Sequence, residues 1–316
     1  MFWRATRCNL DMSSPYNGIA TAITIQAETA LAEASSETVY NLPGKVQFKQ
    51  AVEFTGRGET VNVWRESSAN FYSGMFFTGM LEVELGLNPV VELLLRTFFE
   101  LETAETVGGG APILGDGGLL FGEGGPILGE GSSTTYNSIQ LRPARLPDIK
   151  SLKVGLDFAS ASVLFSGLVI DQIAFDIRRN QVAKLQAQFK AVGRQIVAAP
   201  ALATPTDVEV VRVHHVNSEV SFDGASLVGL TEINLSFNQR KSPAMFAVNK
   251  AATRFIRERF AMSGQLVEYF SPTAVLPSAV ADQAEHDLIV SLTDPSGTAR
   301  RIDFTLPRLV LTEGLP

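Results

Sequence analysis

The strongest constraint on the fold is an alternation of apolar and polar residues between Ser151 and Gly193. A period of two over such a length predicts antiparallel strands with one face on a core and the other in water. Arg179 and Asn180 separate the second and third runs and predict a tight hairpin turn. We therefore expect a three-stranded meander at the centre of a β-domain. Its inward-facing residues are expected to be Leu152, Val154, Leu156, Phe158, Ile173, Phe175, Ile177, Ala183, Leu185, Ala187, Phe189 and Ala191.

Upstream of the meander the chain predicts an arm, a hairpin and a strand followed by a helix. Residues 1–36 are mixed, and they predict either a loosely held arm or a short strand at 20–25. Apolar and polar residues alternate over 45–54 and again over 60–64, with glycines between the two runs, which predicts a hairpin over 44–66. Residues 71–85 predict a further strand with Glu82 and Glu84 on its wet face. Asn88 and Pro89 then begin a helix that is expected to reach Glu102 and to pack on a sheet through Val90, Leu93, Leu94, Thr97 and Phe98.

Downstream of the meander the pattern predicts mostly short strands. Residues 192–205 and the polar stretch 238–243 are expected to be loops, and residues 251–261 fit either a helix or a pair of strands. A short helix is expected over 276–287, introduced by Pro277. The expected strands are 208–213, 220–228, 230–237, 264–270, 288–293, 301–306 and 308–311.

Residues 107–133 form three glycine-rich heptads, at 111–117, 118–124 and 125–131. Glycine at this density is incompatible with a stable helix, so we expect consecutive tight turns or a flap that covers a surface, with a disordered loop in solvent as the alternative. The acids Asp116, Glu123 and Glu130 also allow a calcium site, although a structural insertion fits the pattern better. The large apolar side chains that need covering are Ile113, Leu114, Leu119, Leu120, Phe121, Ile127 and Leu128.

Composition argues against several classes of function. The formal net charge of −7 is unsuited to gripping nucleic acid through its phosphates, and Cys8 is the only cysteine, so neither disulfides nor a cysteine metal site are expected. His214 and His215 are adjacent and would point to opposite faces of a strand. The sequence contains no nucleophile elbow, metalloprotease motif, phosphate loop or dinucleotide fingerprint. Glu82 and Glu84 resemble a glycosidase pair only in their spacing, and we expect neither an enzyme nor a cofactor.

Three blocks of the sequence resemble one known family. The first is YSGMFFTGMLEVELGLNPVVELLLRTFFE, the second runs from Ile149 to Gly193, and the third joins Val267-Glu-Tyr-Phe to the hairpin that ends in Phe304-Thr-Leu-Pro-Arg-Leu. Their order is similar to that in major tail tube proteins of long-tailed bacteriophages, over about residues 60–106 and 134–316. The glycine-rich heptads depart from the family pattern and look like an insertion.

The resemblance implies a mainly-β fold, an antiparallel β-sandwich or partial barrel with one or two flanking helices that closes into a ring barrel on oligomerisation. It also implies a single domain over 37–316, interrupted by the 107–133 insertion and preceded by the arm. Six subunits would form a ring, and rings would stack into a tube that contacts other tail proteins. Genomic DNA would pass through the lumen without specific binding. Such a protein belongs to the virion tail, is made in the bacterial host cytoplasm and has no membrane partner.

Two sets of residues are assembly candidates under this hypothesis. A long early loop bridges to the next ring in the resembled family, so the 44–66 hairpin is expected to reach out of its subunit through Phe48, Val52, Phe54 and Arg57. The apolar side chains of the heptads form the second set. The alternative is a carbohydrate-binding or adhesive β-sandwich, which would need exposed aromatic platforms.

Overall fold

The predicted meander lies at the centre of a larger antiparallel sheet. The computed structural model describes residues 22–28, 38–55, 71–107, 119–123, 136–143, 149–158, 161–246, 249–269, 276, 279, 284–295 and 300–312. Strands β8 (Ser151–Asp157), β9 (Ser162–Arg178) and β10 (Lys184–Val197) pair as antiparallel neighbours in chain order. The inward-facing residues predicted between Ile173 and Ala191 are all at most 4% exposed, which confirms the alternation.

The predicted turn between β9 and β10 is also present. The N–H of Gln181 donates to the carbonyl of Arg178 at 3.1 Å, so Arg179 and Asn180 are the central residues of a β-turn. Asn180 has a φ of 61°, a left-handed conformation that asparagine adopts more readily than most residues.

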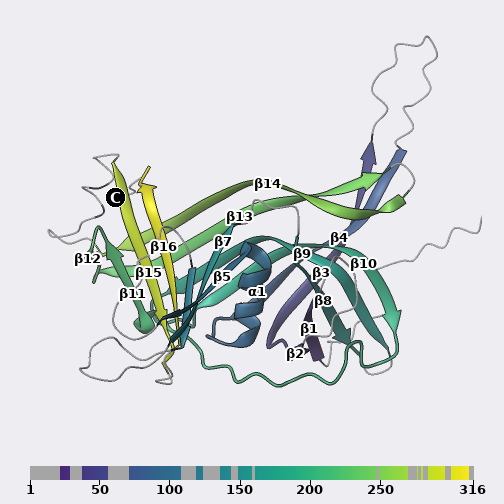
Figure 1. Cartoon of the computed structure of the whole chain (residues 1–316), viewed down its shortest axis with the longest axis horizontal. Coiled ribbons are helices and arrows are strands. Elements are labelled where there is room, and N and C mark those ends of the chain that lie inside the picture. The colour runs from purple at the N-terminus through teal and green to yellow at the C-terminus, as the bar shows by residue number, and fades with distance from the viewer. Residues whose placement is uncertain are drawn as a thin grey trace, which may run out of the picture.

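Six further strands complete this first sheet. On one side β1 (Ala22–Glu28) pairs with β8, and β2 (Tyr40–Asn41) pairs with β1. On the other, β4 (Phe71–Glu84) pairs with β10, and β3 (Gly44–Thr55) pairs with β4. β13 (Leu230–Phe246) pairs with β9, and β14 (Asn249–Glu268) with β13. A parallel bridge between Ala251 and Met75 brings β14 back to β4, so the sheet curls into a half-barrel (Figure 1).

A second antiparallel sheet stands at one end of the first. Its strands lie in the order β12 (Ala225–Ser226), β11 (Ser218–Phe222), β15 (Glu285–Thr293), β16 (Arg300–Val310), β6 (Leu119–Glu123), β7 (Tyr136–Pro143) and β5 (Glu100–Val107). A single 3-10 turn, η1 (His215–Asn217), precedes β11. The fold is therefore mainly β and antiparallel, as predicted.

Helix α1 (Pro89–Phe99) lies in the hollow of the curled sheet (Figure 1). Asn88 Oδ1 accepts hydrogen bonds from the N–H groups of Val90 and Val91, both at 3.1 Å, and Pro89 occupies the first helical position. The predicted start is confirmed. The predicted end at Glu102 is wrong, because Glu100 already begins β5.

Phenylalanine rings join α1 to both sheets. Phe99 of the helix lies 5.7 Å from Phe237 of β13, and Phe304 of β16 lies 4.6 Å from Phe175 of β9 and 5.7 Å from Phe237. Burying each such side chain contributes about 1.5–3 kcal/mol. These rings therefore make one continuous core from the helix and the two sheets.

The N-terminal prediction resolves in favour of the strand. β1 pairs with β8 from Ala22–Asp157 to Glu28–Ser151, so residues 22–28 belong to the sheet and not to a loose arm. The buried carboxylate of Glu28 accepts hydrogen bonds from Ser151 Oγ at 2.6 Å and from Gly167 N–H at 3.0 Å. These hydrogen bonds stabilise the buried carboxylate of Glu28, which the alternating sequence pattern does not predict.

The predicted hairpin over 44–66 has the wrong return strand. β3 pairs along its whole length with β4, from Gly44–Val83 to Thr55–Phe71. The strand that was expected at 60–64 lies outside the described residues. The hairpin is therefore longer than predicted, because β4 extends the pairing to Phe71.

Several downstream boundaries also differ. β10 runs to Val197. Residues 208–213 do not form a strand, and within them only Arg212 makes an isolated bridge, with Gly86. β13 continues through the supposed loop at 238–243, and β14 is one strand over 249–268, because the two pair with each other along this stretch. The stretch 220–228, expected to be one strand, instead contains the hairpin β11–β12. The strand expected at 308–311 is not separate, because β16 continues to Val310. Leu276 and Ala279 are helical, but the helix predicted to reach Asp287 gives way to β15 at Glu285.

The middle glycine-rich heptad is a strand and not a turn. β6 pairs with β16 from Leu119–Phe304 to Glu123–Arg300, and with β7 on its other edge. Both edges are thus hydrogen-bonded inside the same subunit, which offsets the conformational cost of ordering Gly122 within the strand. The remaining heptad residues lie outside the described part of the chain.

The β11–β12 turn offers a test of local backbone strain. Asp223 and Gly224 have φ values of 48° and 78°, the signature of a type I′ hairpin turn, and a Cβ on Gly224 would meet no atom within 4 Å. Gly224→Ala should therefore destabilise the fold by about 1–2 kcal/mol through the left-handed conformation alone. Urea unfolding measures this loss. Gly224→Asn is the matched control and should cost less, since asparagine tolerates this conformation; equal losses would contradict the assignment.

Candidate assembly surfaces

The first sheet has a polar face that points away from α1. On β4, β10, β9 and β13 the buried residues that pack with the helix alternate with residues that face outward. We call these outward residues the charge-paired face. They are Glu82, Glu84, Ala174, Asp176, Arg178, Lys184, Gln186, Gln188, Glu232, Asn234 and Ser236.

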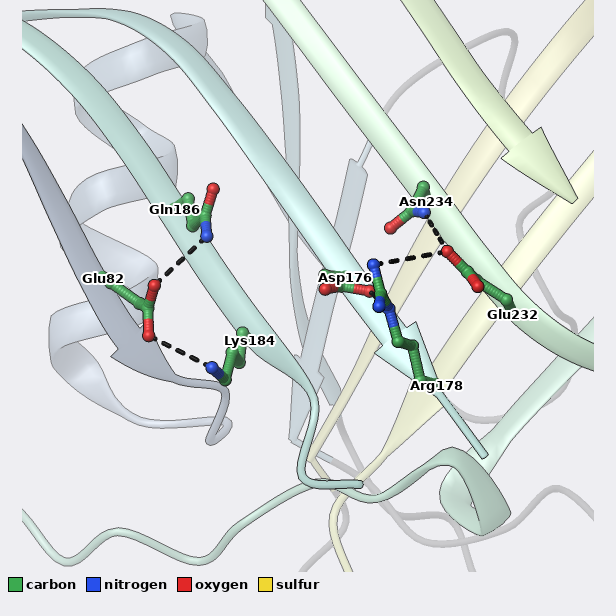
Figure 2. Close-up of polar contacts among 7 residues, drawn as sticks. All are labelled: Glu82, Asp176, Arg178, Lys184, Gln186, Glu232 and Asn234. Carbon is green, nitrogen blue, oxygen red and sulfur yellow. Dashed lines mark hydrogen bonds and ion pairs between the residues drawn. The ribbon is translucent and has the colours of Figure 1, made fainter. Parts of the chain in front are cut away.

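One cluster of this face joins β4 to β10 (Figure 2). Lys184 Nζ lies 3.2 Å from Glu82 Oε1, and Gln186 Nε2 donates to Glu82 Oε2 at 3.2 Å. The hydrogen bond from Lys184 is the main cause that lowers the pKa of Glu82, although partial burial opposes it. The carboxylate therefore stays charged and held in place.

A second cluster joins β9 to β13 (Figure 2). Arg178 Nε donates to Asp176 Oδ1 at 2.8 Å, and a second guanidinium nitrogen lies 3.4 Å from Glu232 Oε1. Asn234 Nδ2 donates to the same Glu232 oxygen at 2.6 Å. Hydrogen bonding to Asp176 raises the pKa of Arg178. The third base that reaches this face, Arg212, pairs with Glu84.

Charge pairing decides what this face can do. Four carboxylates stand against Lys184, Arg178 and Arg212, and each of these three bases contacts a carboxylate. On the neighbouring strand β3, Lys45 lies opposite Glu82 and helps to lower its pKa, and the exposed Lys49 lies opposite Thr78 on the same side of the sheet. A phosphate would have to displace a carboxylate from each of the three paired bases. Glu82 and Glu84, the spacing of which resembles a glycosidase pair, are both engaged by bases on this face. The geometry defines a polar surface on which bases and carboxylates of neighbouring strands are paired.

A second feature is the distal hairpin, residues 239–261 at the tip of β13 and β14. β13 pairs with β9 only from Glu232–Arg178 to Asn238–Gln172, and beyond that point the two strands diverge. Irregular pairing between Gln239 and Lys241 marks the bend. The hairpin then extends to the end of the molecule where β4 lies, on the right of Figure 1.

A buried polar cluster fixes the base of the distal hairpin. Asp171 lies where the register of β9 shifts, and it accepts a hydrogen bond from Lys241 N–H at 3.1 Å and pairs with Lys190 Nζ at 2.7 Å. Lys190 Nζ also donates to the carbonyl of Lys241 at 2.7 Å, and Lys241 Nζ donates to the carbonyl of Ile170 at 2.9 Å. These bonds tie β9, β10 and β13 together at the bend.

The sequence did not reveal this cluster. Asp171, Lys190 and Lys241 are separated by up to 70 residues; Lys190 fits an ordinary solvent-facing strand position, and Lys241 falls in the stretch predicted to be a loop. The available signal was a strand pattern interrupted by a charge, at Asp171 between Ile170 and Gln172. Only the pairing of β13 with β9 brings the three side chains to one place.

The predicted assembly residues fall in three places. Phe48 on β3 stacks on Phe165 at 3.5 Å and lies 4.9 Å from Phe189, so this ring packs against its own sheet. Val52 and Phe54 are on β3, and Leu119, Leu120 and Phe121 are on β6. Outside the described residues lie Arg57, Ile113, Leu114, Ile127 and Leu128.

The fold and the charge-paired face define a mainly-β structural protein. Within the described residues no group of three histidine, cysteine or acidic side chains could hold a metal ion, and no helix there is long and apolar enough to cross a membrane. A family model described as phage tail tube protein matches residues 65–308. The match spans well over half of the chain, and the chain belongs to this family: it is a structural tail tube subunit of a phage virion. No curated protein matches it.

The buried cluster predicts a pH dependence of stability. Burial raises the pKa of Asp171 above its ordinary value of 3.8, and Lys190 and Lys241 only partly oppose this. The folded state therefore binds the proton more tightly than the unfolded state, and the cluster loses stability as the pH rises through the raised pKa. Relative to Asp171→Asn, the wild-type protein should become less stable as the pH rises from below 3.8. Urea unfolding across this range measures the difference.

Two comparisons complete the test. Asp171→Ala removes the acceptor of both bonds and should cost about 1–3 kcal/mol near neutral pH. Asp176→Asn, on the exposed charge-paired face, is the matched control and should not reproduce the pH profile. A difference between wild type and Asp171→Asn that does not change with pH would contradict the assignment.

Proposed function

We propose that six copies of the chain close into a ring, that rings stack into a tube, and that the charge-paired face lines the lumen through which DNA passes. The observation that carries this proposal is the pairing of Arg178, Lys184 and Arg212 on that face with carboxylates. A conduit must not retain its cargo, and unpaired lysines or arginines would retain phosphates. The side chains of this face offer amides, hydroxyls and neutralised charges instead.

The charge of the assembly supports the same orientation. Six subunits at −7 give a ring with a formal charge of −42. At physiological ionic strength this field is screened over about 8 Å, so the local charge of the lumen wall matters most. Four carboxylates against Lys184, Arg178 and Arg212, together with Lys45 and Lys49 of β3, leave that wall close to neutral, without a strong electrostatic barrier to entry.

Open strand edges support ring closure. Within the described residues, one edge of β3 is unpaired, and β14 contacts β4 only at its start, which leaves most of its outer edge without a partner strand. Unpaired edges of this length invite pairing with another chain, and closure of a sheet into a barrel removes them. Pairing between the β14 edge of one subunit and the β3 side of the next would continue the curled sheet around a ring.

The remaining parts of the proposal follow from the family. The partners are other copies of the chain and other tail proteins, the tube has no membrane partner and binds DNA without sequence preference, and the subunit is made in the host cytoplasm before it enters the tail. The 44–66 region and the heptads remain candidate contacts in this assembly.

Electron microscopy of the purified chain tests the assembly. Rings with sixfold symmetry, and tubes built from them, are expected under conditions that promote association. A protein that stays monomeric at high concentration and in all salt conditions would overturn the proposal.

A charge reversal tests which face lines the lumen. Asp176→Lys combined with Glu232→Lys removes both carboxylate partners of Arg178 and should make assembled tubes retain DNA that the wild-type tubes release. Glu209→Lys combined with Glu219→Lys, two exposed acids that are not among the residues of this face, is the matched control. DNA held inside tubes of the first variant only is the expected result; equal retention by both variants would place the face elsewhere.

A further inference from the structure

Positive charge is concentrated in the distal hairpin, whereas the rest of the chain is acidic. The distal hairpin contains six bases and one acid, a formal charge of +5, so the rest of the chain holds −12 to give the total of −7. The bases are Arg240, Lys241, Lys250, Arg254, Arg257 and Arg259, and the acid is Glu258. Such separation within one chain is a physical basis for attraction between copies.

Two of these arginines face solvent. The side chain of Arg240 is 70% exposed and only marginally paired with Glu258, at 3.9 Å, and Arg259 is exposed. Ile256, two residues before Glu258, is 54% exposed despite its apolar side chain. Lys241 points inward instead and serves the bend of the hairpin. The outer side of the distal hairpin thus combines positive charge with apolar area.

An acidic surface lies at the opposite end of the molecule, on the left of Figure 1, where β11, β12, β15 and β16 end. We call this the acidic end. It presents Asp223, Glu285 and Asp287, which the pairing of Phe222 with Leu288 and the bond from Asp223 N–H to the Asp287 carbonyl bring together. Glu285 is 64% and Asp223 51% exposed, and Arg308 lies 3.9 Å from Glu285.

The carboxylate of Asp223 is preorganised. It accepts hydrogen bonds from Asp287 N–H at 2.9 Å and pairs with His286 Nδ1 at 2.7 Å, and these contacts lower the pKa of Asp223. The carboxylate is therefore charged and fixed at the tip of a rigid turn. A fixed charge loses little side-chain entropy when a basic partner docks.

We propose that the distal hairpin of one copy docks on the acidic end of a second copy. Because the two surfaces are different and lie at opposite ends of one chain, the contact is head-to-tail and can propagate through an assembly. This inference rests on the proposed self-assembly and names the surfaces that it uses. The exposed Ile256 favours a protein partner over nucleic acid, since phosphate contacts bury no apolar side chain.

Charge reversal with rescue tests the pairing. Arg240→Glu with Arg259→Glu on the distal hairpin, or Glu285→Lys with Asp287→Lys on the acidic end, should each raise the concentration needed for assembly roughly tenfold, because attraction becomes repulsion. The two double variants mixed in equal amounts should form mixed contacts, and the quadruple variant should assemble again. Light scattering and electron microscopy measure these outcomes.

Controls separate this inference from the proposed function. Lys150→Glu with Lys153→Glu applies the same charge change away from both surfaces and should leave assembly unchanged, and circular dichroism confirms that each variant is folded. If wild-type protein never assembles, the proposed function fails; if it assembles and both reversals assemble equally well, only this inference fails. Rescue by the quadruple variant cannot arise from misfolding.

A DNA-binding assay tests whether the distal hairpin binds nucleic acid instead of a second copy of the chain. A gel shift of a short DNA duplex by wild-type protein that disappears in the Arg240→Glu, Arg259→Glu variant, with assembly unchanged, would assign the distal hairpin to nucleic acid and overturn the inference. Raising salt from about 0.05 to about 0.5 M should weaken wild-type assembly, because exposed charge pairs are screened. Assembly insensitive to salt would also count against it.

Discussion

The architecture depends on a limit of the β-strand: it has two edges, and each stretch of an edge can pair with one neighbour. β9 gives one whole edge to β10, and it divides the other between β8, at residues 162–168, and β13, at residues 172–178. The division falls at Asp171 and follows the irregular backbone at Gly167, where φ is 60°. From this point β8 and β1 continue the curl in one direction and β13 and β14 leave in another. Both the half-barrel and the distal hairpin therefore follow from how β9 shares its edges.

The polar groups at this division have to compensate for lost backbone bonds. Lys241 donates its N–H to Asp171 and not to a strand, and Gly167 donates its N–H to Glu28. In each case a buried carboxylate takes the place of a backbone carbonyl. Buried polar groups left without partners cost several kcal/mol, so these two acids are structural requirements. They hold the strands where the functional surfaces need them.

The sequence predicted the parts of the fold that depend on local pattern. The alternation over 173–191 and the start of α1 at Asn88–Pro89 each depend on residues only a few positions apart, and both predictions are confirmed. It failed where distant partners decide the conformation. Residues 238–243 contain Asn, Gln, Arg, Lys, Ser and Pro, a composition typical of a loop, yet pairing with β14 and burial of Lys241 keep them in β13. The ion pairs of the charge-paired face also join strands up to about a hundred residues apart, which no periodicity shows.

The second sheet has a consequence for how the subunit matures during synthesis. β16 pairs with β6, so the strand made last must find one made almost two hundred residues earlier. Contacts of such long sequence separation make folding slow, because the entropy of closing the intervening loop is lost before the contact forms. The first sheet can take shape while its C-terminal neighbour is still on the ribosome. Because β11, β15 and β16 all follow the meander in the chain, the second sheet can close onto the first only after β16 has left the ribosome.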